Sequence, residues 1–312
     1  MPRRRITIRQ LETFDAVARL RSFSRAADAL HLTQPAVSIQ IRQIAEVIGL
    51  PLFEQNGREI FLTAAGEELQ QTVRELDDVW NRFESAIDGI KGLRRGKLRV
   101  ALVTTAKYFL PRLLGAFYRE HPEIDIELEI ANRERIVERL RGNQDDLYVM
   151  SHPPRDLDVV VRPFLENEYV VVAPPTHWAA TRRQLSLTDL AGEPFLLREP
   201  GSGSRHVIDT FLREQGIELK VRLSLASNEA IRDLVASGMG LSVLSRHALG
   251  RTIEEGELVA LKVRDFPLRQ PWCVVHLRNK VLSLPAQAFI NALLDHSESA
   301  PARTRKRPTR NS

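Results

Sequence analysis

Two helical patterns, separated by a short break, occupy the stretch FSRAADALHLTQPAVSIQIRQI from Phe23 to Ile44. The first is a short run rich in alanine and leucine whose apolar residues share one face. Thr33 is a residue type that caps helices, and Pro35 falls in the first turn of the next helix, where its missing N–H costs nothing. The second helix therefore begins at Gln34, and its apolar positions recur every three or four residues, at Val37, Ile41, Ile44 and Ile48.

The outward face of this second helix carries polar groups that suit DNA. It combines amides and hydroxyls with a single arginine and no acid: Gln34, Ser38, Gln40, Arg42 and Gln43. In the major groove such groups can bond to base edges and phosphates, which would repel an acid. The pattern is typical of a helix-turn-helix, and we expect DNA contacts from Thr33, Gln34, Pro35, Ser38 and Arg42. From spacing alone, a pair of solvated helices in any helical domain fits equally well.

A wing is predicted after the second helix. In GLPLFEQNGREIFLT, two short strands flank a turn at Asn56-Gly57, which makes residues 1–65 a mainly helical, winged helix-turn-helix domain. Arg58 stands at the tip of this wing, where its side chain could reach a phosphate or the minor groove. Taken as an isolated loop residue, a solvated arginine is the alternative.

A long helix is predicted over residues 66–91, with Thr63 as a cap. Its apolar positions alternate between spacings of four and three: Leu69, Val73, Leu76, Trp80, Phe83, Ile87 and Ile90. A repeat of 3.5 residues sustained over three heptads favours pairing with a second helix in a coiled coil. We expect a dimer through this linker helix, and hence double-stranded DNA with two related half-sites as a partner.

Beyond a short basic hinge at residues 92–97, strands alternate with helices. Residues 98–298 read as strand KLRVALV, a helix from Thr105 through His121, strand IDIELEI, helix NRERIVERL, strand DLYVMS and then a second such series. This order predicts an α/β effector domain of two lobes, like a periplasmic binding protein: lobe I at about 98–164 and 268–298, lobe II at about 165–267. Ligands of such folds bind beyond the carboxyl ends of the strands.

Polar residues gather at the strand-to-helix junctions of this domain. Helix N-termini present unsatisfied N–H groups and partial positive charge, so converging junctions suit an anion. The candidate effector-binding residues are Thr104, Thr105, Lys107, Asn132, Arg133, Ser202, Arg205 and Asn228. Each junction alone is more typical of an ordinary helix cap. Among them, GSGSR at 201–205 is the sharpest signal, because its glycines let a ligand approach the backbone while Ser202 and Arg205 donate.

Charge is distributed unevenly along the 312 residues, whose formal net charge is +5. Residues 1–60 hold nine arginines and six acids, and residues 301–312 hold five basic residues and no acid, so a polyanionic partner fits the ends better than the middle. The segment 299–312 reads as a basic, disordered tail. A single cysteine, Cys273, and no apolar run long enough to span a membrane indicate a cytoplasmic chain without a membrane partner.

The segment FSRAADALHLTQPAVSIQIRQIAEVIGLPLFEQNGREIFLTAAG resembles the reading head of the LysR-type transcriptional regulators almost position by position. Ala45 and Gln55 depart from that family, which usually has Glu and Arg there; Gln55 leaves in doubt only an arginine contact. Within the family, TAKYFLP, NRERIVERL and GSGSR look like the CbbR regulators of Calvin-cycle and rubisco operons. This resemblance implies a homotetrameric activator of carbon-fixation genes that answers to a phosphorylated metabolite or a reduced nucleotide, with RNA polymerase as a candidate partner.

Other function classes find less support. The eight histidines are scattered, and neither an HExxH motif, paired CxxC motifs, a GxSxG elbow nor a P-loop is present, so no catalytic residues, metal site or cofactor are expected. A solute-binding protein with a fused DNA-binding head is the runner-up, followed by an enzyme with such a head. A LysR-type regulator of a different metabolic operon also stays open. We therefore expect a regulator with a small-molecule effector and no enzymatic activity.

Overall fold

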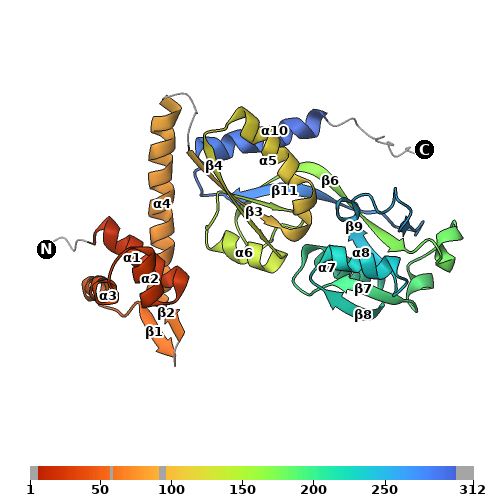
Figure 1. The fold of residues 1–312 in the computed structure, drawn as a ribbon, viewed down its shortest axis with the longest axis horizontal. Helices are drawn as coiled ribbons and strands as arrows, with labels where there is room; N and C mark the ends of the chain where they lie inside the picture. Colours follow the sequence, from red (N-terminus) through yellow and green to blue (C-terminus); the bar gives the residue numbers. More distant parts are fainter. Residues whose placement is uncertain (1–5, 57–58, 91–95, 300–312) are drawn as a thin grey trace, which may run out of the picture. The chain divides into compact units, whose positions relative to one another are not determined.

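The computed structural model describes residues 6–56, 59–90 and 96–299, which divide into two compact units, residues 1–81 and 82–312 (Figure 1). Three features expected from the sequence fall outside the described residues: Arg58, most of the hinge at 92–97, and the basic tail from residue 300 onward. The backbone of Ile90 ends the linker helix, but its side chain is also outside the described set. No helix among the described residues is long and apolar enough to cross a membrane.

The first unit is a three-helix head followed by a two-stranded wing. Thr33 caps the third helix by accepting a hydrogen bond from the Ala36 N–H at 3.4 Å, and Gly49 ends it in the left-handed conformation, with φ of 84°. Phe14, Val37 and Ile44 are fully buried at the centre of the head. The elements are α1 (Ile8–Leu20), α2 (Phe23–Ala29), α3 (Gln34–Ile48), β1 (Phe53–Asn56) and β2 (Glu59–Leu62).

Helix α4 (Ala64–Ile90) leaves the wing and begins where Thr63 accepts a hydrogen bond from the Gly66 N–H at 3.1 Å. Its apolar stripe is not uniform. Val73 is only 3% exposed because it belongs to the core of the head, and Leu69 packs against the same core. This corrects the expectation that all seven stripe positions face a partner helix. The exposed part begins at Leu76 and continues with Trp80, Phe83 and Ile87, which are 48%, 55%, 55% and 37% exposed.

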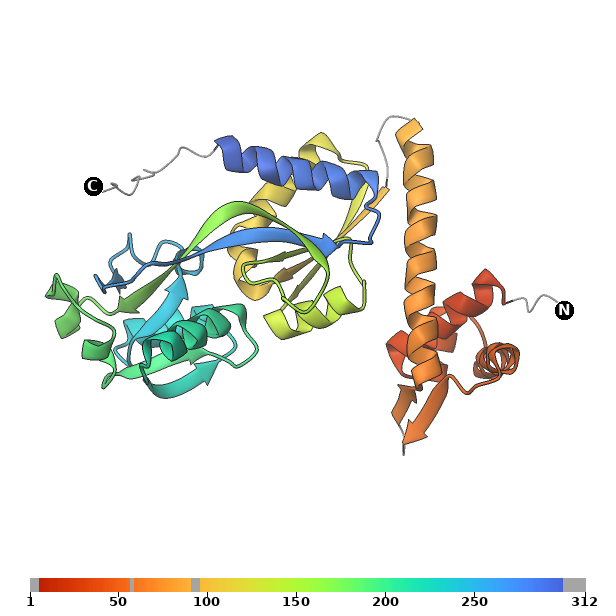
Figure 2. The ribbon, with the colours of Figure 1, turned by 180° about the vertical axis from the view of Figure 1, so that it is seen from behind.

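The second unit contains a mixed sheet that spans both lobes. Seven strands of the described residues form it, in the order β10-β6-β11-β5-β3-β4, with β9 also paired to β6. Strands β3, β5 and β4 are parallel, whereas β6 and β11 are long, antiparallel and run from one lobe to the other (Figures 1 and 2). The bounds are β3 (Gly96–Val103), β4 (Ile124–Ala131), β5 (Leu147–Met150), β6 (Val159–Ala173), β9 (Ser242–Ser245), β10 (Val259–Ala260) and β11 (Leu268–Leu277).

Each lobe has its own apolar core. The core of lobe I centres on Leu98, Tyr148 and Phe289, and the main core of lobe II on Val171, Phe195 and Leu241. Lobe II adds a parallel pair, β7 (Pro194–Arg198) and β8 (Lys220–Leu225). The helices of lobe I are α5 (Leu110–Glu120), α6 (Arg133–Arg141) and α10 (Leu284–Ser299); those of lobe II are α7 (Gly203–Gln215), α8 (Asn228–Ala236) and α9 (Arg246–Leu249), with short 3-10 turns at Trp178–Thr181 and Thr188–Leu190.

One element differs from expectation at the edge of the cleft between the lobes. Instead of a single helix from Thr105 to His121, a 3-10 helix, η1 (Thr104–Tyr108), is followed by α5 from Leu110. Pro111 lies in the first turn of α5, where it lacks an N–H to continue the earlier turn and disfavours the helical conformation before it. Thr104 and Thr105 therefore stand at a 3-10 turn rather than at an α-helix N-terminus.

Candidate functional site

The first candidate site is the exposed side of α3. Thr33, Gln34, Pro35 and Arg42 are exposed and Ser38 is half-buried, so this start of the helix is accessible to a ligand. Gln34 Nε2 donates to Ser38 Oγ at 3.1 Å, which ties these two polar groups together. Ile39 is 53% exposed beside them and was missed, although an apolar side chain on such a face can contact a thymine methyl group.

Two amides of α3 form hydrogen bonds to side chains of α1. Gln40 accepts a hydrogen bond from Thr13 Oγ1 at 2.8 Å, and Gln43 accepts one from Gln10 Nε2 at 3.0 Å. Both bonds join α3 to α1, so these residues hold the reading helix on its support. Gln40 is half-buried, which corrects its expected place on the outward face, whereas Gln43 is exposed as expected.

The second candidate site is a cavity between the lobes. Five of the eight predicted effector residues line it, and three do not. It is lined by Val103, Thr104, Thr105, Asn132, Arg133 and Ser151 of lobe I and by Tyr169, Arg198, Ser202, Gly203, Ser204 and Trp272 of lobe II and the shared strands. Its volume is about 10 Å³, which is room for about one water molecule.

The start of α6 and the start of α7 approach one another at this cavity. The Asn132 side chain caps α6 by accepting from Arg135 N at 3.0 Å, and Ser202 caps α7 by accepting from Arg205 N at 3.1 Å. The Glu134 N–H donates to the Gly201 carbonyl at 3.1 Å, so the first turn of α6 is bonded to the loop that precedes α7. Both helices present partial positive charge to the same small space.

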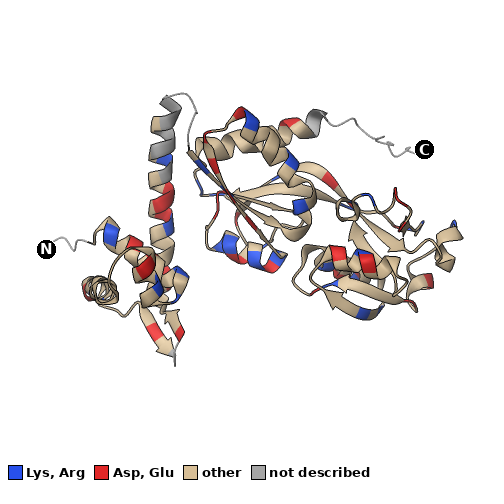
Figure 3. Cartoon of the chain, viewed as in Figure 1, with Lys and Arg blue, Asp and Glu red and all other residues tan. Residues whose placement is uncertain are grey.

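Arg133 is one of two arginines that line the cavity, the other being Arg198. The Arg133 Nε donates to the His152 carbonyl at 3.0 Å, and Arg133 makes no ion pair with any described carboxylate. Burial lowers the pKa of this guanidinium, against the attraction of Asp156. Arginine and glutamate alternate along α6 (Figure 3), and its other arginines are paired: Arg135 with Glu138, Arg139 with Asp145 and Arg141 with Asp156.

Three predicted residues do not line the cavity, and each is bonded to a neighbouring side chain. The Arg205 Nε donates to Asp209 Oδ1 at 2.8 Å, one turn along its own helix. Lys107 Nζ lies 2.9 Å from Glu229 Oε1, and Asn228 accepts from Arg198 Nη1 at 3.1 Å. The structure thus places Thr104, Thr105, Asn132, Arg133 and Ser202 together, and it does not place Lys107, Arg205 and Asn228 with them.

Polar side chains that the sequence patterns did not single out complete the walls. Ser151 Oγ and the Tyr169 hydroxyl lie 3.3 Å apart, and burial raises the pKa of Tyr169. Arg198 is 2% exposed and pairs bidentately with Glu199, at 2.8 and 3.0 Å. Trp272 is fully buried, and its Nε1–H has no hydrogen-bond partner among the described residues. An unpaired buried donor is costly, so a ligand oxygen or a water is expected beside it.

Contacts between the lobes surround the cavity. The Tyr108 hydroxyl donates to Glu229 Oε1 at 2.8 Å beside the Lys107 ion pair. Burial raises the pKa of Glu229, but the hydrogen bonds from Lys107, its own backbone and Ser227 outweigh it and lower that pKa to about 2. On the other side, the rings of His152 and His206 lie 5.0 Å apart. These contacts join the two lobes beside the cavity.

A DNA-reading head and a two-lobed domain with a polar cavity define a class, the ligand-sensing transcriptional regulators. Residues 8–67 match the family described as "Bacterial regulatory helix-turn-helix protein, lysR family", and residues 91–298 match "LysR substrate binding domain". The chain belongs to the LysR family of transcriptional regulators. The match confirms the predicted fold class and the regulatory rather than enzymatic role, and the helix-turn-helix implies binding to DNA.

Three relatives show which group within the LysR family this chain resembles. The transcriptional activator CmpR of Synechocystis is 42% identical over 94% of this chain and 96% of its own length, and the RuBisCO operon transcriptional regulator of Acidithiobacillus ferrooxidans is 44% identical over 93% and 94%. Together with CbbR of Rhodospirillum rubrum, 43% identical over 91% of this chain and 94% of its own length, they confirm the resemblance to the CbbR group.

Solved structures agree with this placement. The regulatory domain of Synechocystis CcmR, solved in complex with 2-PG, is 41% identical, with a TM-score of 0.63 over 66% of this chain and 99% of that domain. A full-length OxyR variant of Pseudomonas aeruginosa has a TM-score of 0.75 over 97% of this chain and 99% of that one. At 22% identity, OxyR supports the fold alone.

Proposed function

We propose that this chain regulates transcription of carbon-fixation genes, and that a small phosphorylated anion bound between its lobes is the signal. The observation that carries the proposal is the CcmR regulatory domain, which is 41% identical over 66% of this chain and was solved in complex with 2-PG. We take 2-phosphoglycolate, the compound of that complex, as the test ligand. Relatives named for RuBisCO operons and for CbbR support the target genes.

The chemistry of the cavity supports an anion there. The starts of α6 and α7 direct N–H groups and partial positive charge toward it, and Arg133 adds a full charge that no described carboxylate neutralises. A half-buried cation without a counter-ion is unfavourable, so a ligand carboxylate or phosphate would relieve its desolvation. The hydroxyls of Thr105 and Ser204 and the Trp272 N–H are further donors on the walls, whereas the Thr104 hydroxyl donates to the Ala131 carbonyl at 3.0 Å.

Entry of such a ligand requires the lobes to move apart. The cavity has room for about one water, whereas a phosphorylated acid has about nine heavy atoms. The ligand would therefore shift a balance between closed and open arrangements, and the shift cannot exceed its differential affinity for the two. This shift would couple effector binding to DNA binding. Arg133 would supply the charged contact to the ligand that the sequence analysis expected from Arg205.

The DNA side of the proposal rests on α3 and α4. Gln34, Pro35, Ser38 and Arg42 would contact DNA, with Thr33 at the helix start and Arg58 reaching from the wing. Leu76, Trp80, Phe83 and Ile87 form an exposed heptad-spaced stripe that suits pairing with a second copy, which would present two reading heads to two half-sites. Assembly of dimers into a tetramer and contact with RNA polymerase complete the proposal by resemblance to the family.

The test compares two arginines on one helix. Arg133→Gln should weaken 2-phosphoglycolate binding to the full chain at least tenfold in calorimetry, because a charge-assisted bond is lost. Arg135→Gln is the matched control, since Arg135 pairs with Glu138 outside the cavity, and it should bind as wild type does. In a footprinting assay on a carbon-fixation promoter, 2-phosphoglycolate should alter the wild-type footprint and leave that of Arg133→Gln unchanged. Equal binding by the two variants would refute the cavity assignment.

A further inference from the structure

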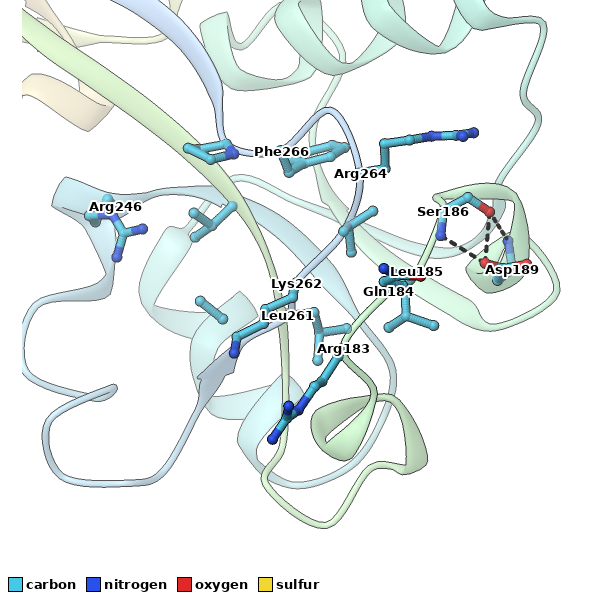
Figure 4. A pocket seen from close by; sticks show the side chains of 14 residues that line it. Arg183, Gln184, Leu185, Ser186, Asp189, Arg246, Leu261, Lys262, Arg264 and Phe266 are labelled. Atoms are coloured by element: carbon cyan, nitrogen blue, oxygen red, sulfur yellow. Dashed lines mark hydrogen bonds between the residues drawn. The ribbon is translucent and has the colours of Figure 1, made fainter. Parts of the chain in front are cut away.

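A second pocket lies within lobe II, away from the cavity between the lobes. Its volume is about 830 Å³, compared with about 10 Å³ for the inter-lobe cavity. A volume of this size is in the range of sites for small organic ligands. Its walls come from β6, from the segment 183–189, from the start of α9 and from the segment 260–267 (Figure 4). None of the candidate effector residues lines it.

The floor of this pocket is apolar and built on main-chain bonds. Leu185, Leu261 and Val263 are 6%, 7% and 4% exposed and belong to the main core of lobe II. The Arg264 N–H donates to the Leu185 carbonyl at 2.7 Å, and the Leu261 N–H donates to the Val171 carbonyl at 2.9 Å. The first bond joins the two loops to each other and the second ties one of them to β6, so the pocket is formed before any ligand arrives.

The rim of the pocket is cationic. Arg183, Arg246, Lys262 and Arg264 line it, against a single carboxylate, Asp189. That carboxylate accepts from the Ser186 N–H and hydroxyl at 2.7 and 2.8 Å, so it is directed at its own turn.

Two of the four cations have acidic neighbours, and two do not. Arg246 pairs with Glu168 at 2.9 Å, and Arg264 lies 3.7 Å from Asp265. Arg183 and Lys262 form no ion pair within the part of the chain that the structure describes. Figure 4 shows these two side chains extending from the floor on the same side of the pocket, whereas Arg264 points away from them.

We infer that this pocket binds a small organic polyphosphate, whose phosphates meet Arg183 and Lys262 while its organic body rests on the floor of Leu185, Leu261 and Val263. Two cations on one side select at least two negative charges, and a bare anion would leave the apolar floor uncovered. The site is distinct from the inter-lobe cavity, so a ligand here would act on lobe II alongside the effector. The inference stands whether or not 2-phosphoglycolate is the signal.

The experiment uses ADP as the probe, with pyrophosphate and adenosine as its two halves. Calorimetry on the full chain should show ADP binding with a dissociation constant below about 1 mM, the upper end of ordinary metabolite affinities, and weaker binding at high salt. Pyrophosphate and adenosine should each bind more weakly than ADP. Arg183→Gln and Lys262→Gln should each weaken ADP about tenfold, as expected for one charge-assisted contact.

The control variant is Arg182→Gln, because Arg182 is an exposed neighbour of Arg183 that does not line the pocket. It should bind ADP as wild type does, and the two pocket variants should keep wild-type affinity for 2-phosphoglycolate. Absence of saturable ADP binding, equal affinity in the pocket variants and wild type, or competition between ADP and 2-phosphoglycolate would each overturn the inference. Pyrophosphate binding as tight as that of ADP would overturn the role of the floor.

Discussion

Adding one methyl group at Gly203 should separate the stability of the sensor from its response to ligand. Gly203 is the first residue of α7 and lines the inter-lobe cavity. A Cβ at this position would lie 3.9 and 4.0 Å from Cβ and Cδ of Arg133 across the cavity, which is ordinary van der Waals contact, and the backbone φ is not positive. Gly203→Ala therefore fits the structure without strain.

The two expected effects of Gly203→Ala have opposite directions. Alanine in place of glycine favours a helix by up to about 1 kcal/mol, less in the first turn, and the buried methyl adds up to about 0.8 kcal/mol. The variant should unfold at the same free energy or up to about 1 kcal/mol higher. The same methyl would contact Cβ and Cδ of Arg133 in a cavity with room for about one water, so it would take up space beside the start of α7 that the proposed anion needs.

We expect Gly203→Ala to bind 2-phosphoglycolate at least tenfold more weakly by calorimetry, with urea unfolding showing an intact fold. Gly192→Ala is the control, because a Cβ there meets nothing within 4 Å and the residue lies outside the cavity. Gly201 is not a suitable position for this test. Its φ is 86°, and an added Cβ would lie 2.6 Å from Glu134 Oε2, so any side chain there would be strained. Wild-type affinity in a stable Gly203→Ala variant would refute ligand binding at the start of α7.

Three further predictions concern the head, the linker helix and pH. Gln34→Ala should cost about 1 to 3 kcal/mol on a specific DNA site and little on random DNA, whereas Arg42→Ala, as a phosphate contact, should weaken both alike; equal losses on both DNAs in fluorescence anisotropy would show that neither reads sequence. Trp80→Glu would place charge in a paired seam and should lower the mass found by sedimentation, and an unchanged oligomer would exclude pairing through α4. Burial, His206, Arg133 and Arg155 lower the pKa of His152 to about 4, so below pH 6.5 the unfolded chain takes up a proton that the folded chain does not. Stability should fall between pH 6.5 and pH 4, by about 1 kcal/mol after allowing for the partial exposure of the ring, and urea unfolding of His152→Gln should show a smaller fall.

Local patterns predicted the elements whose causes are local. Thr33, Asn132 and Ser202 cap the helices that follow them, because a cap needs only a side-chain oxygen and an N–H three residues on. The heptad spacing of α4 is local too. It could not predict that Val73 packs into the core of the head, since the other residues of that core lie far from it in the sequence.

The cavity was only partly predictable for the same reason. The Arg205 ion pair with Asp209 spans four residues of one helix, so that spacing is a signal that could have removed Arg205 from the site. The pairing of Lys107 with Glu229 joins residues from both lobes and leaves no such signal. No sequence pattern predicts that Trp272 lines the cavity either, because it lies in the middle of β11, where the register with β6 shifts by one residue.

The contacts that close the cavity also determine what a binding experiment measures. Glu134 to Gly201, Tyr108 to Glu229 and His152 to His206 lie around a space that admits about one water, so a ligand bound as we propose would have to separate at least some of them before it enters. The measured affinity is then the intrinsic affinity reduced by the fraction of molecules that are open. A substitution can therefore change the apparent affinity in two ways, through the ligand's own contacts or through this balance. Gly203→Ala removes none of these three contacts, but its methyl gains a contact with Arg133 across the cavity and so also favours the arrangement in which the lobes are together. Its weaker apparent affinity would therefore combine the loss of space for the ligand with a shift of this balance.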